Sequence, residues 1–170
     1  MSAANIGKLT IKRINGDYKL FLQANSEHFD VIMNPNNILE IHFLMIGRKG
    51  TPYEGGHYIG KITHNSEYPL KAPEIMACTP NGRFVINKNI CLTNSSYHQE
   101  SWAPAAWNLL SILEGFSSVW HSDIREDKVG ISHIENTPKD EIKKLAEKSI
   151  SFNQQNYSHI YNDFPKIKNN

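Results

Sequence analysis

Apolar residues near the N-terminus recur at helical spacing. Ile11, Ile14, Tyr18 and Phe21 follow one another at intervals of three or four residues. This spacing places their side chains on one face of an α-helix. The pattern therefore predicts a first helix over residues 9–23.

Between residues 28 and 77 the helical pattern gives way to short runs of β-branched and aromatic residues. Segments rich in Pro, Gly and Asn separate these runs, as is typical of turns between strands. Because no helical pattern lies between the runs, we expect consecutive strands to pair as an antiparallel meander. The four predicted strands cover residues 28–33, 38–46, 57–62 and 74–77.

From Thr79 to about residue 104 the chain shows no periodic pattern. Long irregular segments inside a compact domain are usually functional or disordered. Apolar residues such as Phe84 and Trp102 argue against disorder. We therefore predict a folded loop that carries a functional site.

Helical spacing returns in the C-terminal half of the chain. It predicts a buried helix over residues 106–120 and another helix over residues 138–155, which Thr137 would cap. Residues 158–164 are expected to form a short turn-like segment that docks weakly. A helix, a meander, a long loop and further helices in this order predict an α+β fold.

The composition fits one domain. The chain has 170 residues, of which 39% are hydrophobic and 21% are charged, and its formal net charge is +1. This length is too short for two comfortable domains, so we expect a single domain over residues 1–170. The balanced charge offers no electrostatic basis for binding nucleic acid, and we expect no nucleic-acid partner.

The sequence also bears on the cellular compartment. It shows neither the apolar core of a secretory signal at its start nor a run approaching the roughly 20 apolar residues of a membrane span. We therefore expect a cytoplasmic or nuclear protein. In that compartment Cys78 and Cys91 would be reduced thiols.

Motifs for bound cofactors are missing from the sequence. It has no glycine-rich phosphate-binding motif. Its eight histidines are scattered, without a C-x-x-C or H-E-x-x-H pattern. We therefore expect no metal site and no cofactor.

Five short motifs follow one another along the chain between residues 51 and 105. The motifs are Thr51-Pro52-Tyr53-Glu54-Gly55-Gly56, Tyr68-Pro69-Leu70-Lys71-Ala72-Pro73, Thr79-Pro80-Asn81, Ile90-Cys91-Leu92 and Trp102-Ala103-Pro104-Ala105. Each is a weak signal alone, but in this order they resemble the successive signatures of the ubiquitin-conjugating enzymes. The resemblance covers residues from about 10 to 165 and implies the ubiquitin-conjugating fold.

One branch of this family is more similar than the others. Most members carry His-Pro-Asn where this chain has Thr79-Pro80-Asn81, and the spacing from Asn81 to Cys91 is longer here. These features resemble the tail-anchored enzymes of endoplasmic-reticulum-associated degradation. That branch ends in a hydrophobic membrane tail, whereas this chain ends in Lys166–Asn170 without one. A soluble homologue and a chain cut before its anchor both fit this difference.

The resemblance implies that Cys91 receives ubiquitin from the ubiquitin-activating enzyme as a thioester. The acyl group then passes to a lysine of a protein substrate, usually with a ubiquitin ligase, which we expect to be of the RING type. The residues agree with this, because Cys is the best nucleophile for acyl exchange and Cys91 lies in the irregular loop. Cys78 ends a predicted strand and is expected to be packed.

Asn81 is the second candidate catalytic residue. The resemblance implies that its amide stabilises the oxyanion that develops during transfer. Asn81-Gly82 is also a common turn pair, so holding the loop through backbone hydrogen bonds is the alternative role. The sequence leaves both roles open.

The acceptor lysine must lose a proton, and family members often place an acidic or polar residue across the cleft for this purpose. Asp123, Glu126 and Asp127 lie in the matching linker, and His98 is a further polar neighbour. For each of the four, a solvated or turn-stabilising role is the favoured alternative.

The resemblance also implies a docking surface that the activating enzyme and the ligase share. The first helix and the loops that hold Leu70 and Ala105 form it. Leu70 stands where many members have Phe, and its smaller contact predicts a different ligase preference. The alternatives are a solvated basic helix face and, for Pro69, a rigid strand connection. The residues carried over are Lys8, Lys12, Arg13, Pro69, Leu70, Pro104 and Ala105.

Two other functions remain open from the sequence. One is a catalytically idle variant that binds ubiquitin or a ligase, although such variants typically lack the cysteine found here at Cys91. The other is conjugation of a different ubiquitin-like modifier, which the sequence excludes poorly.

Overall fold

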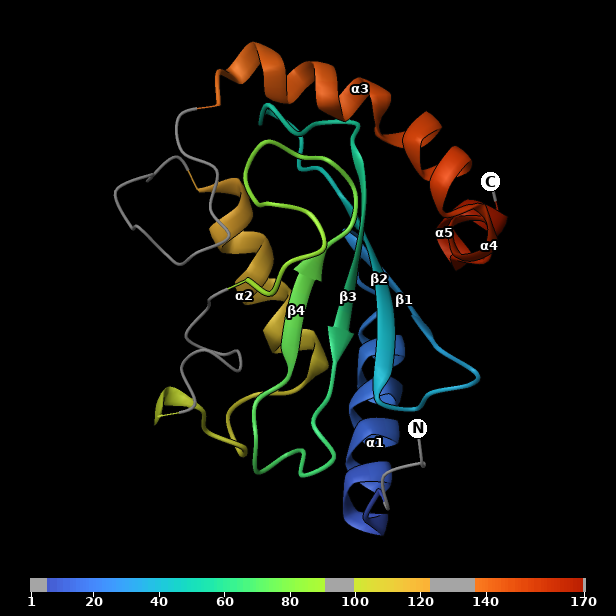
Figure 1. Ribbon diagram of the computed structural model, residues 1–170, viewed down its shortest axis with the longest axis vertical. Helices are drawn as coiled ribbons and strands as arrows, with labels where there is room; N and C mark the ends of the chain where they lie inside the picture. Colours follow the sequence, from blue (N-terminus) through green and yellow to red (C-terminus); the bar gives the residue numbers. More distant parts are fainter. Residues whose placement is uncertain (1–5, 91–99, 123–136, 170) are drawn as a thin grey trace.

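In the residues that the computed structural model describes, 6–90, 100–122 and 137–169, four strands form one antiparallel sheet. Their order in the sheet follows their order along the chain, which confirms the predicted meander (Figure 1). The strands are β1 (Phe29–Met33), β2 (Glu40–Ile46), β3 (His57–Thr63) and β4 (Glu74–Ala77).

The helices lie on both sides of this sheet. In Figure 1, α1 and α2 lie behind the sheet and α3 crosses its upper end, whereas α4 and α5 lie beside its other face. The described helices are α1 (Lys8–Ala24), α2 (Leu109–His121), α3 (Lys139–Asn156), α4 (Ser158–Tyr161) and α5 (Pro165–Lys168). Together with the sheet they form the α+β arrangement that the sequence predicts.

Two helix starts differ from the prediction. The helix predicted from residue 106 begins at Leu109, because the Asn108 side chain accepts a hydrogen bond from the Ser111 amide, and the Ser111 hydroxyl accepts one from the Asn108 amide. This reciprocal pair satisfies two amides of the first turn. At the start of α3, Pro138 and not Thr137 occupies the cap position.

The inner core lies between the sheet and the helices α1 and α2. Phe43 of β2 meets Phe116 of α2 edge to face, with 5.6 Å between the ring centroids. Phe84, from the loop after β4, stacks on Phe116 at 5.5 Å and is fully buried. This loop is therefore part of the core. Opposite Phe43 in the register lies Gly60, where a Cβ atom would come within 2.1 Å of the Phe43 ring.

The outer face of the sheet is also apolar, and residues 157–168, which we call the C-terminal segment, cover it. Tyr161 and Phe164 retain only 2% and 0% of their exposed surface. They pack against Leu44 and Ile59, which point away from the inner core. The expected weak docking of residues 158–164 is therefore wrong, because the segment supplies the second cover that a sheet with two apolar faces needs.

Two polar contacts hold the C-terminal segment in place. The Tyr161 hydroxyl shares a 2.6 Å hydrogen bond with Nδ1 of His57 on β3. The Lys166 amide donates to the carboxylate of Asp30 on β1. Burial raises the pKa of the Asp30 carboxyl, and the bond from Lys166 opposes this rise.

Throughout the described ranges, no helix is both long enough and apolar enough to cross a membrane.

Phe164→Ala tests the cover on the outer face. Removing a fully buried phenyl ring leaves a cavity, so the free energy of unfolding should fall by about 3–5 kcal/mol in urea denaturation. Lys168→Ala, in the same segment but exposed, should change it by less than about 0.5 kcal/mol. Equal, small effects of both variants would contradict the packing described here.

His64 predicts a loss of stability in acid. Its side chain is 3% exposed, and Nδ1 donates to the Leu39 carbonyl at 3.0 Å. Burial lowers the pKa of His64 to about 4, so between pH 6.5 and 4 the unfolded chain binds the proton and the folded chain does not. Stability from this group is therefore complete above pH 6.5 and falls by about 3 kcal/mol on reaching pH 4.

The measurement is the free energy of unfolding of wild type and His64→Asn across this pH range. Asn keeps a donor for Leu39 but does not titrate. The stability advantage of wild type at pH 7 should shrink by about 3 kcal/mol at pH 4. A difference that stays constant with pH would contradict the assignment to His64.

Candidate active site

The Asn81 side chain closes the loop that follows β4. Its Nδ2 donates to the carbonyls of Thr79 and Phe84, at 3.0 and 3.2 Å. Its Oδ1 accepts from the amides of Arg83 and Phe84, at 2.8 and 2.7 Å. The residue is 1% exposed, so the carboxamide takes the place of water as a hydrogen-bond partner for four backbone groups of the loop.

The same loop is fixed to α2 and α3. Gly82 has a φ of +77°, which favours glycine, and a Cβ there would lie 3.0 Å from the Thr137 side chain and 3.1 Å from that of Ile142. Arg83 is buried, and its guanidinium donates at 3.2 Å to the Val119 carbonyl in the last turn of α2. A cation at this end of a helix is favourable. The loop is therefore held rigidly between two helices.

The chain remains anchored as far as the residue before Cys91. The Asn87 amide donates to the Ala77 carbonyl at 2.7 Å, and the Ile90 amide donates to the Ile75 carbonyl at 2.8 Å. Residues 87–90 thus run along β4, and Ile90 is 1% exposed. The sheet therefore fixes the point from which the predicted nucleophile follows.

Five predicted site residues lie outside the described residues, and their roles stay predictions. They are Cys91, His98, Asp123, Glu126 and Asp127.

Cys78 is packed, as the sequence predicts. The residue is 5% exposed and lies in the outer core beneath the C-terminal segment. Burial raises the pKa of its thiol to about 11. Because the thiolate is the reactive form, Cys78 is a poor nucleophile at neutral pH.

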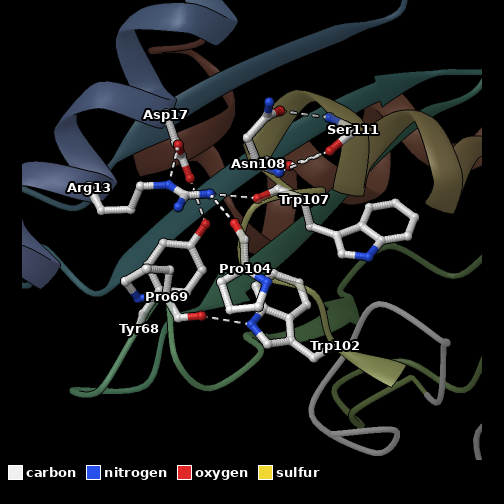
Figure 2. A network of polar contacts seen from close by, with 9 residues as sticks. All are labelled: Arg13, Asp17, Tyr68, Pro69, Trp102, Pro104, Trp107, Asn108 and Ser111. Carbon is white, nitrogen blue, oxygen red and sulfur yellow. Dashed lines mark hydrogen bonds and ion pairs between the residues drawn. The ribbon is translucent and has the colours of Figure 1, made fainter. Parts of the chain in front are cut away.

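Figure 2 shows that Arg13 joins α1 to the loop that leads into α2. Its Nη2 donates to the carbonyls of Pro104 and Trp107, at 2.9 and 2.6 Å. Its Nε pairs with Asp17 at 2.8 Å, one helical turn further along α1. The predicted docking residues of α1 and of the Pro104 loop thus lie together.

The turn that holds Pro69 belongs to the same network. The Tyr68 hydroxyl donates to the second carboxylate oxygen of Asp17 at 2.5 Å, and the Arg13 guanidinium lies 5.6 Å from the centre of the Tyr68 ring. Burial and the bond to Asp17 raise the pKa of Tyr68. The Trp102 indole donates to the Pro69 carbonyl at 2.7 Å. One partly buried polar network (Figure 2) therefore joins all three segments of the predicted surface.

Arg13 lies differently from its neighbours on α1. Lys8 and Lys12 are exposed, whereas the Arg13 guanidinium is engaged by the protein itself. Sequence reasoning missed Asp17, although its spacing of four residues from Arg13 is typical of an ion pair on a helix.

The three segments form a surface that combines apolar side chains and cations. Leu70 is 69% exposed and Leu9 66% exposed. A shallow groove of about 460 Å³ runs between α1 and residues 105–108, with Lys12 and Leu20 among its lining residues. Such a surface fits a protein partner that presents apolar and acidic groups.

Within the described ranges, no group of three or more His, Cys, Asp and Glu side chains is placed to hold a metal ion. The absence of a cofactor stays a prediction.

Comparison with known proteins identifies the family. The family model described as "Ubiquitin-conjugating enzyme" matches residues 13–152. The chain is 41% identical over 146 residues to "Probable ubiquitin-conjugating enzyme E2 33" of Arabidopsis thaliana, with 86% of this chain and 58% of that protein covered. It is 39% identical over 146 residues to "Ubiquitin-conjugating enzyme E2 J2-like" of Dictyostelium discoideum, with 86% of this chain and 82% of that protein covered.

A further relative is "Ubiquitin-conjugating enzyme E2 6" of Candida glabrata, which is 40% identical over 156 residues. That match covers 92% of this chain and 61% of the relative, so the chain spans about three fifths of the Arabidopsis and Candida proteins. Because the family model extends from α1 through the Asn81 loop to α3, this chain belongs to the ubiquitin-conjugating enzyme family.

Proposed function

We propose that this protein is a ubiquitin-conjugating enzyme with Cys91 as its nucleophile. The observation that carries the proposal is the family match over residues 13–152, which includes the Cys91 position. The burial of Cys78, which raises the pKa of its thiol, supports the choice of Cys91. The same match supports one catalytic domain over residues 1–170.

The proposed reaction consists of two acyl transfers. The Cys91 thiolate attacks the thioester carbonyl carbon of ubiquitin on the activating enzyme, and that enzyme's sulfur leaves as a thiolate. A lysine amine of a protein substrate then attacks the Cys91 thioester. The carbon–sulfur bond breaks, the amine loses a proton, and an amide bond forms. Asp123, Glu126, Asp127 and His98 are the candidates for accepting that proton.

The described contacts of Asn81 bear on its role in the second transfer. In the protein without ubiquitin on Cys91, both hydrogens of Nδ2 point to backbone carbonyls. This supports loop organisation as one role of Asn81. Donation to the oxyanion is a second proposed role, and it requires Nδ2 to exchange one of these carbonyls for the reacting oxygen.

The proposed partners are the ubiquitin-activating enzyme and a RING-type ligase, which would share the surface described above. Lys8, Lys12, Leu70 and Ala105 are exposed there and would contact them, whereas Pro69 and Pro104 are half-buried. Arg13 would act indirectly by holding the three segments together. A cytoplasmic or nuclear location would keep the Cys91 thiol reduced.

Cys91→Ser tests the assignment of the nucleophile. With activating enzyme, ATP and ubiquitin, wild type should form an adduct that reductant cleaves, because a thioester exchanges with thiols. The serine variant should form an ester that resists reductant, and both adducts can be followed by gel electrophoresis.

Cys78→Ala is the matched control and should keep the reductant-sensitive adduct. The assay should include other ubiquitin-like modifiers. If one of these forms the adduct and ubiquitin does not, that modifier and not ubiquitin is the one conjugated. If neither ubiquitin nor any of these forms an adduct, the result would favour a catalytically idle protein that only binds its partners.

Leu70→Ala tests the docking surface. The side chain is 69% exposed, so its truncation should leave the melting temperature unchanged while it removes an apolar contact with the activating enzyme. The KM for the conjugating protein in the charging reaction should rise by about tenfold, equivalent to about 1.4 kcal/mol. Leu22→Ala, 53% exposed near the other end of α1, is the control, and equal KM values for both variants would contradict the proposed surface.

A further inference from the structure

Asn153 is an asparagine of α3 with no exposed surface. A buried amide is costly unless it is hydrogen-bonded. Here both ends of the carboxamide are used, because Oδ1 accepts from the Thr79 hydroxyl at 2.6 Å and Nδ2 donates to the His57 carbonyl at 2.8 Å. Asn153 therefore bridges the start of β3 and the residue at which the Asn81 loop begins.

Thr79 is held equally firmly. It is fully buried, and its Oγ1 accepts from the Ile59 amide at 2.9 Å while donating its hydrogen to Asn153. The hydroxyl cannot rotate without losing one of these bonds. The carbonyl of the same residue accepts from Nδ2 of Asn81. A chain of buried hydrogen bonds thus runs from Asn153 through Thr79 to Asn81.

We propose that Asn153 is a positioning residue for the Asn81 loop and that it acts through the Thr79 hydroxyl. Asn153 fixes the side chain of Thr79, and the direction of the Thr79 carbonyl then fixes the Asn81 carboxamide that closes the loop. The activity part of this inference rests on the proposed function, whereas the loop geometry does not. Asn153 lies just beyond residues 13–152, the range of the family match.

Neighbouring contacts explain why α3 can serve as a fixed support. The His57 amide donates to the Ser149 hydroxyl at 2.8 Å, one turn before Asn153 on α3. The His57 side chain meets Tyr161 of the C-terminal segment. The first residue of β3 is therefore bound at its amide, its carbonyl and its ring, and Asn153, which binds the carbonyl, also accepts a hydrogen bond from Thr79.

Ser149 supplies a matched control for a merely structural role. Ser149→Ala removes a partly buried hydrogen bond between α3 and β3, as Asn153→Ala does, but the hydrogen bonds of the Ser149 hydroxyl go to His57 and Ala146. If Asn153 served stability alone, the two variants would behave alike once compared at equal stability in urea denaturation. If Asn153 positions the loop, the two variants would differ in the exchange of the backbone amides that donate to Asn81.

The first readout is amide hydrogen exchange in the protein that carries no ubiquitin. The amides of Arg83 and Phe84 both donate to Oδ1 of Asn81, so their exchange reports the loop directly. Asn153→Ala should accelerate both by about tenfold, and Ser149→Ala should not. Thr79→Ser, which keeps the hydroxyl, should behave as wild type, whereas Thr79→Val should resemble Asn153→Ala.

The second readout is discharge of the thioester to free lysine. Asn153→Ala should form the ubiquitin thioester at the wild-type rate. Its transfer of ubiquitin to free lysine should be about tenfold slower, because small misplacements of a reacting group are costly. Asn153→Ala keeps the bond between Ile59 and Thr79, so it is usable even if Thr79→Val fails to fold. Exchange and discharge equal to those of Ser149→Ala would overturn the inference. Absence of any wild-type adduct would overturn the proposed function instead, and the exchange measurement would still decide the positioning role.

Discussion

Phe43, Leu44 and Met45 are consecutive residues of β2, and all three are buried, although successive side chains of a strand point to opposite faces. A sheet with two apolar faces must be covered twice. Helices α1 and α2 cover one face and the C-terminal segment covers the other. The chain after β4 passes between the two cores, with Cys78 in the outer core and Phe84 in the inner core. Both covers therefore hold the described part of the candidate site, the loop that contains Asn81.

In the two candidate functional loops, backbone amides and carbonyls determine what the polar side chains nearby bind. These loops lack the regular pairing of a sheet or helix, and a buried unpaired carbonyl or amide is costly. Asn81 and Arg13 meet this need from within the protein, with hydrogen bonds to four and two backbone groups respectively. The proposed docking surface and the loop before Cys91 are therefore shaped by inward-facing polar side chains, which leaves the exposed residues around them for the proposed partners.

Much of the fold could be predicted from the chain because its patterns are local. The strands follow from short β-branched runs between turns, and α1 follows from the spacing of Ile14 and Phe21. The start of α2 could not be predicted closely, because apolar residues before Asn108 also fit a helix and the cap decides between them. The firm packing of the C-terminal segment could not be predicted, because helices of four residues have no periodic pattern. The segment is buried because it covers an apolar face of the sheet that would otherwise be exposed to solvent.

The sequence by itself determined the fold class, the family and the motif that contains Asn81, since strand runs, helix spacing and short motifs are readable without distant contacts. Tertiary structure decided which polar residues face inward. Arg13 resembles its exposed neighbour Lys12 in sequence, yet it joins three segments, because Pro104 and Trp107 bring unpaired carbonyls to it. Asn153 meets Thr79 across 74 residues. Such a pairing depends on how α3 packs against β3, which no local pattern encodes.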